Sequence, residues 1–375
     1  MSEINSNLAE PLRVGKLELS NRIVLAPLTR NRADDNHVPS NLAVEYYSQR
    51  ASFPGTLLIS EGTFPAARLG GYDNVPGIYN SEQIKGWKNV TDAVHAKGSF
   101  IFCQLWGLGR AATPEVLAKE GNRVISSGNL PMPNGAVPQP LDEAGIEQTI
   151  EQYTQAAKNA IAAGFDGVEV HSANGYLIDQ FLQDTCNNRT DRWGGSIENR
   201  ARFGLEVTKR VIAAIGSERT GFRISPWGTF QGMRMKDPRP TFKYYVDQLS
   251  HLNLAYLHIV EPRVNVIVDI EPVAGDSNDF LIDAFRNSGA IILCGGFKPE
   301  FADKTIEKEK NRGHPNVATA FGRPYIANPD MPYRAIHNVP LTHYDRSTFY
   351  TVKSGVGYVD YPYSKAFLES RVSKL

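Results

Sequence analysis

Short apolar segments recur along the chain at intervals that suit alternating strands and helices. Eight segments are predicted to be strands: Ile23–Leu28, Thr56–Ser60, Ser99–Leu105, Phe165–His171, Gly221–Pro226, Leu254–Val260, Ala290–Cys294 and Val317–Phe321. Each is nearly continuous in hydrophobic residues, without an apolar and polar alternation. Such a run is typical of a strand that is buried on both faces of a parallel sheet.

Most gaps between these segments have the periodicity of amphipathic helices. In Ser81–Lys97 and Leu141–Ala163 the apolar residues are three and four positions apart, and Ser81 and Asp142 are predicted to be the N-caps. Strand and helix repeated in this way predict an α/β fold, a (β/α)8 TIM barrel. We expect one domain over residues 1–375, because a barrel of about 250 residues with insertions accounts for this length.

Two gaps are longer than a simple crossover between strands. They are Gly109–Gly145, which is rich in proline and glycine, and Glu261–Asn278. Loops that follow the strands of such a barrel cover its open carboxyl-terminal mouth. We therefore expect both insertions to form walls of a substrate pocket.

The overall composition narrows the class of partner. Forty Lys and Arg residues balance forty Asp and Glu residues, so the chain has no net basic charge that would attract nucleic acid or an anionic membrane. Three cysteines without a C-x-x-C pair suit a reducing compartment. The segment Met1–Arg13 lacks the apolar core of a signal peptide, and no run reaches the roughly 18 apolar residues of a membrane span. We expect a soluble cytoplasmic protein with small-molecule partners.

Polar residues collect where the predicted strands end, which is where barrel enzymes place their reactive groups. His171, Asn174 and Tyr176 follow the fourth strand and bring three hydrogen-bonding side chains to one point of the mouth. Arg223 stands inside the apolar fifth strand, where an unpaired guanidinium is costly to bury, and so predicts an anionic partner.

The last two strands end in residues that suit a phosphate monoester. Gly295 and Gly296 follow the seventh strand, and Gly322 and Arg323 follow the eighth, which is a common phosphate site in this fold.

Each of these features also has a purely structural interpretation. Paired glycines at strand ends often form turns, a histidine at a strand end can be a hydrogen-bonded core residue, and Arg223 can pair with a structural carboxylate. The aromatic residues Trp106, Tyr72, Phe230 and Phe280 can all be core. Metal binding is not predicted, because the histidines and carboxylates show no spacing typical of metal ligands. A dedicated dinucleotide domain and a serine hydrolase site are not predicted either, because no G-x-G-x-x-G or G-x-S-x-G motif is present.

Taken together, the motifs resemble those of the old yellow enzymes, the FMN-dependent ene-reductases, and within them the yeast and fungal branch. Segments similar to the family extend over nearly the whole chain in the family's order: Ala26–Arg30, Gly71–Asn74, Gln104–Trp106, His171–Phe181, Arg189–Phe203, Arg223–Phe230, Val260–Arg263, Ser277–Phe280, Phe321–Asp330 and Tyr344–Pro362.

The resemblance implies tightly bound, non-covalent FMN as the cofactor and NADPH as the reductant. It places the flavin ring against Pro27, Thr29, Gly62, Gln104 and Arg223, with Arg223 beside N1 and O2 of the flavin. It assigns the phosphate to Gly295, Gly296, Phe297, Gly322 and Arg323. The bound flavin would then be the anionic partner that the burial of Arg223 requires.

The resemblance also implies a reaction, the reduction of the C=C bond of α,β-unsaturated aldehydes and ketones with ping-pong kinetics. His171 and Asn174 are expected to bind the carbonyl oxygen while hydride passes from flavin N5 to the β-carbon, and Tyr176 is expected to protonate the α-carbon. The expected substrate pocket is lined by Tyr72, Trp106, Phe230, Phe280 and Tyr358.

Two residues depart from the family's pattern. Gln231 stands where the yeast enzymes have Asn, and Gly107 stands where relatives often carry a bulkier residue. Both are expected to reshape the pocket and so to affect substrate preference.

Two other functions stay open at this point. One is a dedicated fungal enzyme of secondary metabolism that reduces or isomerises an alkaloid aldehyde, and Tyr176 favours reduction because isomerisation needs no proton donor. The other is a flavoprotein that binds phenols or steroids and turns over slowly. A monomer and a homodimer both fit the sequence.

Overall fold

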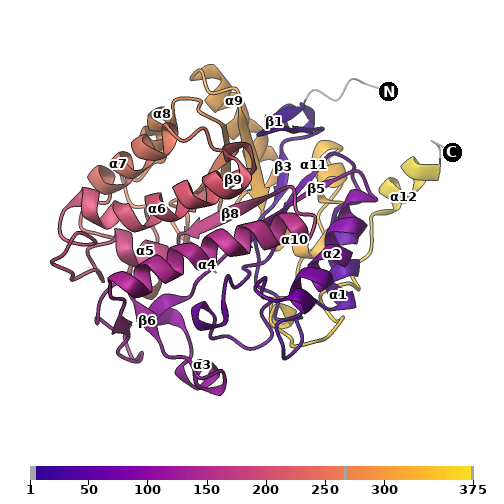
Figure 1. Ribbon diagram of the computed structural model, residues 1–375. Coiled ribbons are helices and arrows are strands. Elements are labelled where there is room, and N and C mark those ends of the chain that lie inside the picture. Colours follow the sequence, from indigo (N-terminus) through magenta and orange to yellow (C-terminus); the bar gives the residue numbers. More distant parts are fainter. Residues whose placement is uncertain (1–5, 266–267, 373–375) are drawn as a thin grey trace.

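The fold is built on a closed barrel of parallel strands. The computed structural model describes residues 6–265 and 268–372, and within them eight strands close in the order β10, β13, β14, β3, β4, β5, β8 and β9 (Figure 1). Their bounds are β3 (Ile23–Leu25), β4 (Leu57–Ile59), β5 (Phe100–Leu105), β8 (Gly167–Ser172), β9 (Thr220–Ile224), β10 (Tyr256–Val260), β13 (Ala290–Cys294) and β14 (Val317–Phe321). The predicted (β/α)8 barrel is confirmed, and each strand lies inside its predicted segment or extends one residue beyond it.

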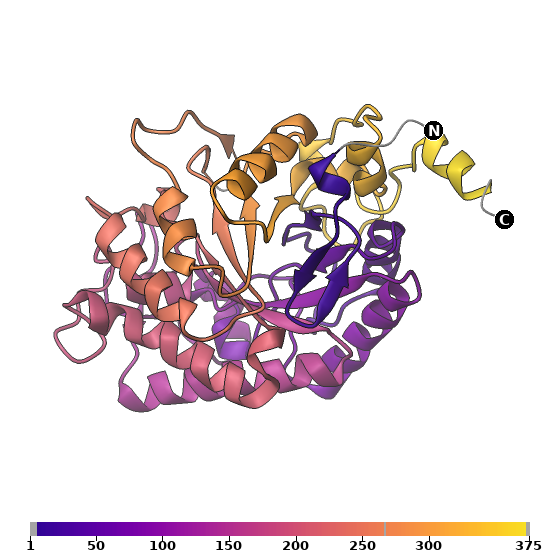
Figure 2. The same cartoon turned by 90° about the horizontal axis from the view of Figure 1, so that it is seen from above.

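Helices surround the barrel and cover the outer faces of the strands (Figures 1 and 2). The longer ones are α1 (Asn41–Arg50), α2 (Ser81–His95), α4 (Glu143–Ala162), α6 (Ile197–Ile215), α7 (Arg239–Ser250) and α9 (Pro299–Asn311). The shorter ones are α3 (Pro114–Lys119), α5 (Leu177–Leu182), α8 (Asp279–Phe285), α10 (Arg323–Ala327), α11 (Met331–Ile336) and α12 (Lys365–Val372).

The N-caps of two helices test the sequence prediction directly. Asp142 caps α4 as predicted, and its side chain accepts a hydrogen bond from the amide of Gly145 at 2.7 Å. The prediction of Ser81 for α2 is wrong by one residue. Asn80 is the cap, because its side chain accepts from the amide of Gln83 at 2.9 Å and satisfies a free amide of the first turn.

Buried apolar side chains of the described residues form three clusters, of which the smallest surrounds Trp106 and the other two are layers of the barrel. The larger layer lies between the strands and the helices and includes Trp87, Tyr153 and Phe203. The smaller layer fills the barrel, and it continues into an antiparallel hairpin of β1 (Leu12–Val14) and β2 (Leu17–Leu19). This hairpin, drawn in indigo in Figure 2, closes the amino-terminal end of the barrel and leaves the carboxyl-terminal end as the open mouth.

The two long insertions differ in what they do at the mouth. Residues 109–145 form α3 and the small pair β6 (Ile125–Ser126) and β7 (Gln139–Pro140), which project away from the barrel in Figure 1, and none of the described side chains there lines the central cavity. The prediction that this insertion is a pocket wall is therefore wrong. The second insertion forms β11 (Val264–Asn265) and β12 (Val268–Asp269) and does line the cavity, while its residues 266–267 lie outside the described part.

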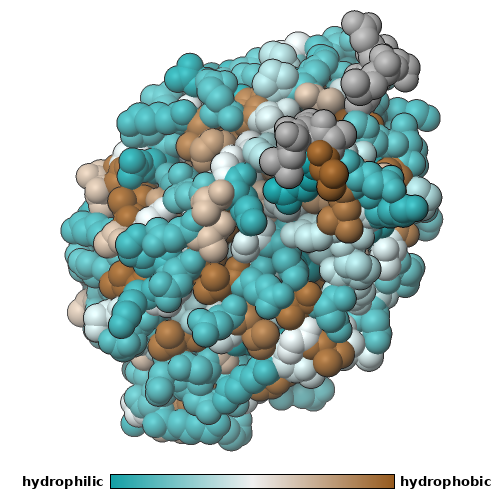
Figure 3. All heavy atoms as spheres, turned by 90° about the vertical axis from the view of Figure 1, so that its right-hand side faces the viewer, coloured by the Kyte–Doolittle hydropathy of each residue, from teal (hydrophilic) through white to brown (hydrophobic). Residues whose placement is uncertain are grey.

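The surface mixes polar and apolar side chains. On the face shown in Figure 3, hydrophobic side chains are scattered among hydrophilic ones and do not merge into one broad patch. Across the described ranges, no helix combines the length and the apolar character needed to span a bilayer.

Candidate active site

A cavity of about 740 Å³ opens at the carboxyl-terminal ends of the barrel strands. Its size falls within the usual range of small-molecule and cofactor sites. Thirteen of the residues predicted from the sequence line it: Pro27, Thr29, Gln104, Trp106, His171, Asn174, Tyr176, Arg223, Gly295, Gly296, Phe297, Gly322 and Arg323. Residues from six different strand ends thus meet in one space.

His171 lies near the end of β8, and its ring orientation is fixed by a local contact. The backbone amide of Ala173 donates a hydrogen bond to Nδ1 of His171 at 3.2 Å, so Nδ1 is an acceptor and a neutral ring carries its proton on Nε2. Burial, together with the charges of Arg223 and His258, lowers the pKa of His171 far below its ordinary value. The imidazole is therefore a neutral hydrogen-bond donor.

The backbone after β8 turns sharply to bring Asn174 to the same cavity. Asn174 adopts a left-handed conformation with φ of 57°, which asparagine tolerates better than most residues. Its backbone N–H donates to Oγ of Ser225 at 2.6 Å, and the backbone N–H of Gly175 donates to the carboxylate of Asp179 at 2.9 Å. These two bonds hold the turn that presents Asn174 and Tyr176.

Tyr176 follows this turn and packs edge-on against Trp106, with 4.8 Å between the ring centroids. Burial raises the pKa of the Tyr176 hydroxyl well above its ordinary value, so the hydroxyl keeps its proton at neutral pH. The hydroxyl of Tyr72 and the side chain of Gln231 lie within hydrogen-bonding reach of it. Gln231 therefore does shape the site.

Arg223 and Gln104 lie on the inner wall of the barrel, beneath the mouth. Nη2 of Arg223 contacts the thiol of Cys294 at 3.5 Å, and its Nε is buried without a hydrogen-bond partner. Among the described residues, no carboxylate forms an ion pair with Arg223, so the guanidinium has no carboxylate partner in direct contact. A buried guanidinium with an unused N–H on a cavity wall fits an anionic or acceptor-rich ligand.

Gly295 and Gly296 form the other end of the cavity. Both have positive φ, 124° and 62°, which favours glycine, and they lead directly into the amino terminus of α9. Arg323 lies on the adjacent strand end and pairs with Asp269 of β12. Bare amides, a helix amino terminus and a guanidinium together are suited to a phosphate.

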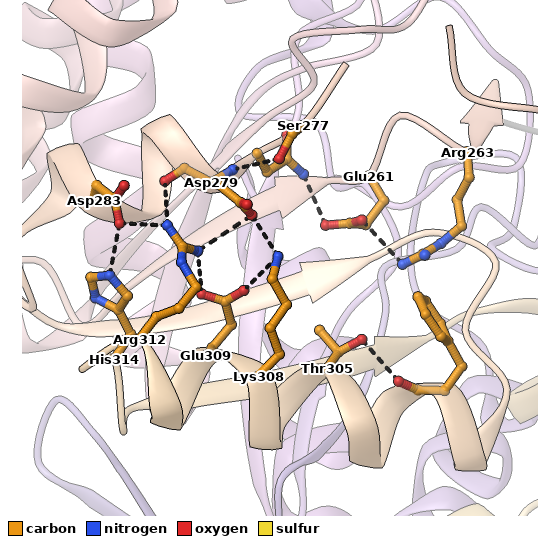
Figure 4. A network of polar contacts seen from close by, with 12 residues as sticks. Glu261, Arg263, Ser277, Asp279, Asp283, Thr305, Lys308, Glu309, Arg312 and His314 are labelled. Carbon is orange, nitrogen blue, oxygen red and sulfur yellow. Dashed lines mark hydrogen bonds and ion pairs between the residues drawn. The ribbon is translucent and has the colours of Figure 1, made fainter. Parts of the chain in front are cut away.

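Polar contacts around α9 hold this end in place (Figure 4). Arg263 donates from Nε to the carbonyl of Gly295 at 2.7 Å, and it pairs with Glu261 at 3.1 Å. Farther along α9, Lys308 and Arg312 bind Asp279 of α8 at 2.8 and 3.3 Å. The network ties the helix to its neighbour and fixes the direction of its amino terminus.

The other predicted site residues do not line the cavity. Gly62 lies behind Trp106, because a β-carbon there would be 2.3 Å from the indole, and Tyr72 packs on the same indole at 5.8 Å. Phe230 lies in the single turn η5 (Phe230–Gly232), outside the lining.

Phe280 and Tyr358 were expected in the pocket, and the structure contradicts this. Phe280 is on α8 and packs against Trp227 at 6.1 Å. Tyr358 is fully buried, stacked on Tyr46 at 4.2 Å and covered by the guanidinium of Arg30. Tyr358 packs against α1 and Phe280 packs against Trp227 in the turn after β9, so neither ring reaches the cavity.

Gly107 also has a different role from the expected one. A β-carbon there would lie 2.9 Å from the hydroxyl of Tyr153 and 3.2 Å from Leu177. The residue thus leaves room for packing behind the strand, and it does not enlarge the cavity.

Several residues in or below the site were not identified from the sequence. Glu169, His258 and Cys294 form a polar cluster inside the barrel, and Tyr350 lines the cavity from the carboxyl-terminal segment. Glu169 and His258 stand inside apolar strand segments in the same way as Arg223, so the argument that singled out Arg223 applies to them too. Tyr350 lies in a region without periodicity and gives no such signal.

Comparison with known proteins agrees with this geometry. Residues 7–342 match the model of the NADH:flavin oxidoreductase / NADH oxidase family. The solved old yellow enzyme of Pichia sp. AKU4542 superimposes with a TM-score of 0.88 at 39% sequence identity, over 96% of this chain and 95% of that one. The chain belongs to the old yellow enzyme family.

Two fungal relatives are more similar in sequence. Chanoclavine-I aldehyde reductase fgaOx3 of Penicillium roqueforti is 52% identical over 364 residues, which is 96% of this chain and 98% of that protein. The NADP-dependent oxidoreductase lnbE of Aspergillus flavus is 49% identical over 367 residues, 96% and 97% of the two chains. This old yellow enzyme is thus a flavin oxidoreductase with fungal relatives.

The cavity fits FMN, the cofactor that the old yellow enzyme family implies. The orphaned Nε of Arg223 lies where an acceptor is needed, and the Gly295–Gly296 turn leaves its amides uncovered by side chains of its own. Within the described ranges, no three His, Cys, Asp or Glu side chains gather as a metal site.

Proposed function

We propose that this protein reduces the C=C bond of α,β-unsaturated aldehydes or ketones, with FMN as its bound cofactor and NADPH as its reductant. The observation that carries the proposal is the meeting of His171, Asn174 and Tyr176 in the same cavity as Arg223 and the Gly295–Gly296 turn. Two donors for a carbonyl oxygen and one proton donor thus share a space with the groups that fit a flavin.

The chain offers a complete set of contacts for the cofactor. Pro27, Thr29, Gln104 and Arg223 would contact the ring system, and Gly295, Gly296, Phe297, Gly322 and Arg323 would hold the phosphate. Bound FMN supplies the hydride that the reaction needs. Gly62 acts indirectly, because its missing side chain is what allows Trp106 to lie where it does.

His171 and Asn174 would polarise the substrate carbonyl. Nδ1 of His171 is occupied by the amide of Ala173, so Nε2–H is the group available to donate to the carbonyl oxygen. The lowered pKa keeps the ring neutral, and a neutral donor can stabilise negative charge that develops on oxygen without first losing a proton.

Tyr176 would deliver the proton to the α-carbon. Its raised pKa keeps the hydroxyl protonated, which a general acid requires. Tyr72 and Gln231, which lie within reach of the hydroxyl, would orient it toward the substrate.

An absorbance experiment tests the proposal as a whole. The purified protein, loaded with FMN, is reduced anaerobically with NADPH and then mixed with cyclohexenone. We expect the flavin band to bleach with NADPH and to return with the enone. A protein that takes up no FMN contradicts the cofactor assignment, and bleaching without recovery contradicts enone reduction.

The name of the Penicillium relative favours a second, more specialised candidate. We propose chanoclavine-I aldehyde as the first specialised substrate to compare with cyclohexenone, because this chain is 52% identical to a protein named as its reductase. Tyr176 favours net reduction over isomerisation, so the product is expected to gain two hydrogens. Mass spectrometry of the product separates reduction, isomerisation and a merely binding flavoprotein.

A further inference from the structure

A chain of polar side chains runs across the interior of the barrel, below the cavity. Glu169 of β8 accepts from Nε2 of Gln104 at 2.7 Å and contacts Nδ1 of His258 at 2.8 Å. The other ring nitrogen of His258 is buried and faces the thiol of Cys294, which in turn contacts Arg223 at 3.5 Å. This row of polar side chains therefore links Gln104 to Arg223, two residues expected to contact the flavin.

Cys294 lines the cavity together with Gln104 and Arg223, the two ends of this polar network. It is the last residue of β13 and is 4% exposed, and it lines the cavity next to Gly295. Among the described residues, its sulfur is the one hydrogen-bond partner of the Arg223 guanidinium. The position of this guanidinium thus depends on a thiol, where a carboxylate is the usual partner of a buried arginine.

The surroundings of Cys294 favour its ionised form. Burial alone would raise the pKa of Cys294, but His258 and Arg223 outweigh burial and lower it to about 7. The charged and titratable groups that face Cys294 are Arg223 on β9, His258 on β10 and Arg263 after β10. Glu169 on β8 acts on it through His258, and Tyr256 on β10 lies beside Arg223. Its other barrel neighbour, β14, presents Ala320 beside it.

The other two cysteines provide an internal comparison. Cys103 and Cys186 are buried with no cation in hydrogen-bond contact, and burial raises the pKa of each to about 12. The environment of Cys294 is therefore specific to its place beside Arg223 and His258.

We propose that Cys294 is a positioning residue that sets the reduction potential of the bound flavin through its contact with Arg223. A cation beside the pyrimidine end of the flavin favours the reduced, negatively charged form, and a thiolate next to that cation offsets part of its charge. Ionisation of Cys294 thus lowers the potential, and His258 with Glu169 supports the ionised state. The inference rests on the proposed function, because it requires FMN against Arg223.

The test is the FMN midpoint potential, measured between about pH 6 and pH 8.5, across the ionisation range of thiols. Cys294→Ala is compared with wild type and with Cys186→Ala, a buried cysteine outside the cavity. At the alkaline end we expect Cys294→Ala to favour reduced flavin about tenfold more than wild type, a shift of about 30 mV to more positive potential for a two-electron couple. The difference shrinks as the pH falls. Equal potentials in the two alanine variants at every pH overturn the proposal.

Cys294→Ser separates the contact from the charge. A hydroxyl can still contact Arg223 but does not ionise in this range. The serine variant is therefore expected to retain FMN, and its midpoint potential is expected to show no pH-dependent difference from that of Cys294→Ala. A serine variant that follows wild type at every pH contradicts the role of thiol ionisation.

A measurement on the wild-type protein keeps the inference testable if the variants fold poorly. In FMN-free protein, alkylation of Cys294 by iodoacetamide is followed by mass spectrometry as the pH rises. We expect half-maximal reactivity at about pH 7, with protection by FMN and no reaction at Cys103 or Cys186. Half-maximal reactivity at the ordinary thiol value of about 8.5 overturns it. A protein that binds no FMN in any form contradicts the proposed function instead, so the two failures are distinguishable.

Discussion

Glu169 accepts a hydrogen bond from Nε2 of Gln104 at 2.7 Å, inside the barrel. Both residues are buried, and the bond fixes which end of the Gln104 amide faces the cavity: the carbonyl oxygen is left to accept from the flavin. The carboxylate stays charged, because His258, Arg223 and Gln104 outweigh burial and lower the pKa of Glu169.

This contact leads to the first prediction. Glu169→Gln replaces a charge-assisted hydrogen bond with a neutral one and frees the Gln104 side-chain amide to turn. We expect FMN affinity to fall roughly 10- to 100-fold, the scale of a lost hydrogen bond to a charged group. Fluorescence titration of FMN-free protein measures the affinity. The matched control is Glu309→Gln, a carboxylate equally buried on α9 but distant from the cavity, which is expected to lower stability without this loss of affinity. Equal FMN affinity in the two variants contradicts the assignment.

The second prediction concerns pH and His171. The folded-state pKa of His171 lies below its unfolded value of about 6.5, so the unfolded chain binds more protons as the pH falls below that value. The contribution of His171 to the free energy of unfolding is therefore complete above about pH 6.5. Below that pH it falls by up to about 1.4 kcal/mol per pH unit for one proton. His171→Asn, which keeps a donor but does not titrate, is expected to flatten this slope. Urea unfolding at several pH values measures it, and an unchanged slope in the variant contradicts a neutral His171.

The third prediction concerns the space that Gly62 leaves for Trp106. In Gly62→Ala the new β-carbon would lie 2.3 Å from the indole, so the ring must move. We expect a loss of about 1–3 kcal/mol in stability and a changed KM for enones, because Trp106 lines the cavity. Gly228→Ala is the control, since a β-carbon there meets nothing within 4 Å. Thermal unfolding and steady-state kinetics compare them, and matching behaviour of the two variants contradicts the packing role.

The fourth prediction concerns Asp269, whose carboxylate pairs with Arg323 at the phosphate end. It competes with a phosphate for the same guanidinium, so Asp269→Asn is expected to bind FMN roughly two- to fivefold more tightly, the scale of an exposed ion pair. Riboflavin, which has no phosphate, is expected to bind equally to both proteins. Glu271→Gln, an exposed acid on the same insertion, is the control. A gain shared by riboflavin, or shown equally by the control, shifts the cause away from Arg323.

Much of the fold followed from the sequence because a strand buried on both faces has few polar residues, and all eight barrel strands show this pattern. The site followed less completely. Glycines and charged residues at strand ends, such as Gly296 and Arg323, are constrained by backbone geometry and burial cost, and the structure brings them to one cavity. Phe280 and Tyr358 lie in segments whose direction the sequence pattern does not give, and an aromatic side chain packs as well against Trp227 or α1 as in a pocket. The prediction that the insertion at 109–145 forms a pocket wall was wrong because the length of an insertion does not give its direction.

The central claim is that Tyr176 protonates the substrate, and single-turnover kinetics of Tyr176→Phe test it most directly. We expect NADPH to reduce the variant's flavin at nearly the wild-type rate, while reoxidation by cyclohexenone slows about 100- to 10,000-fold, the usual contribution of a general acid. Tyr244→Phe, a half-buried tyrosine on α7 outside the cavity, is expected to match wild type in both steps. Unchanged reoxidation in Tyr176→Phe would contradict proton transfer from Tyr176.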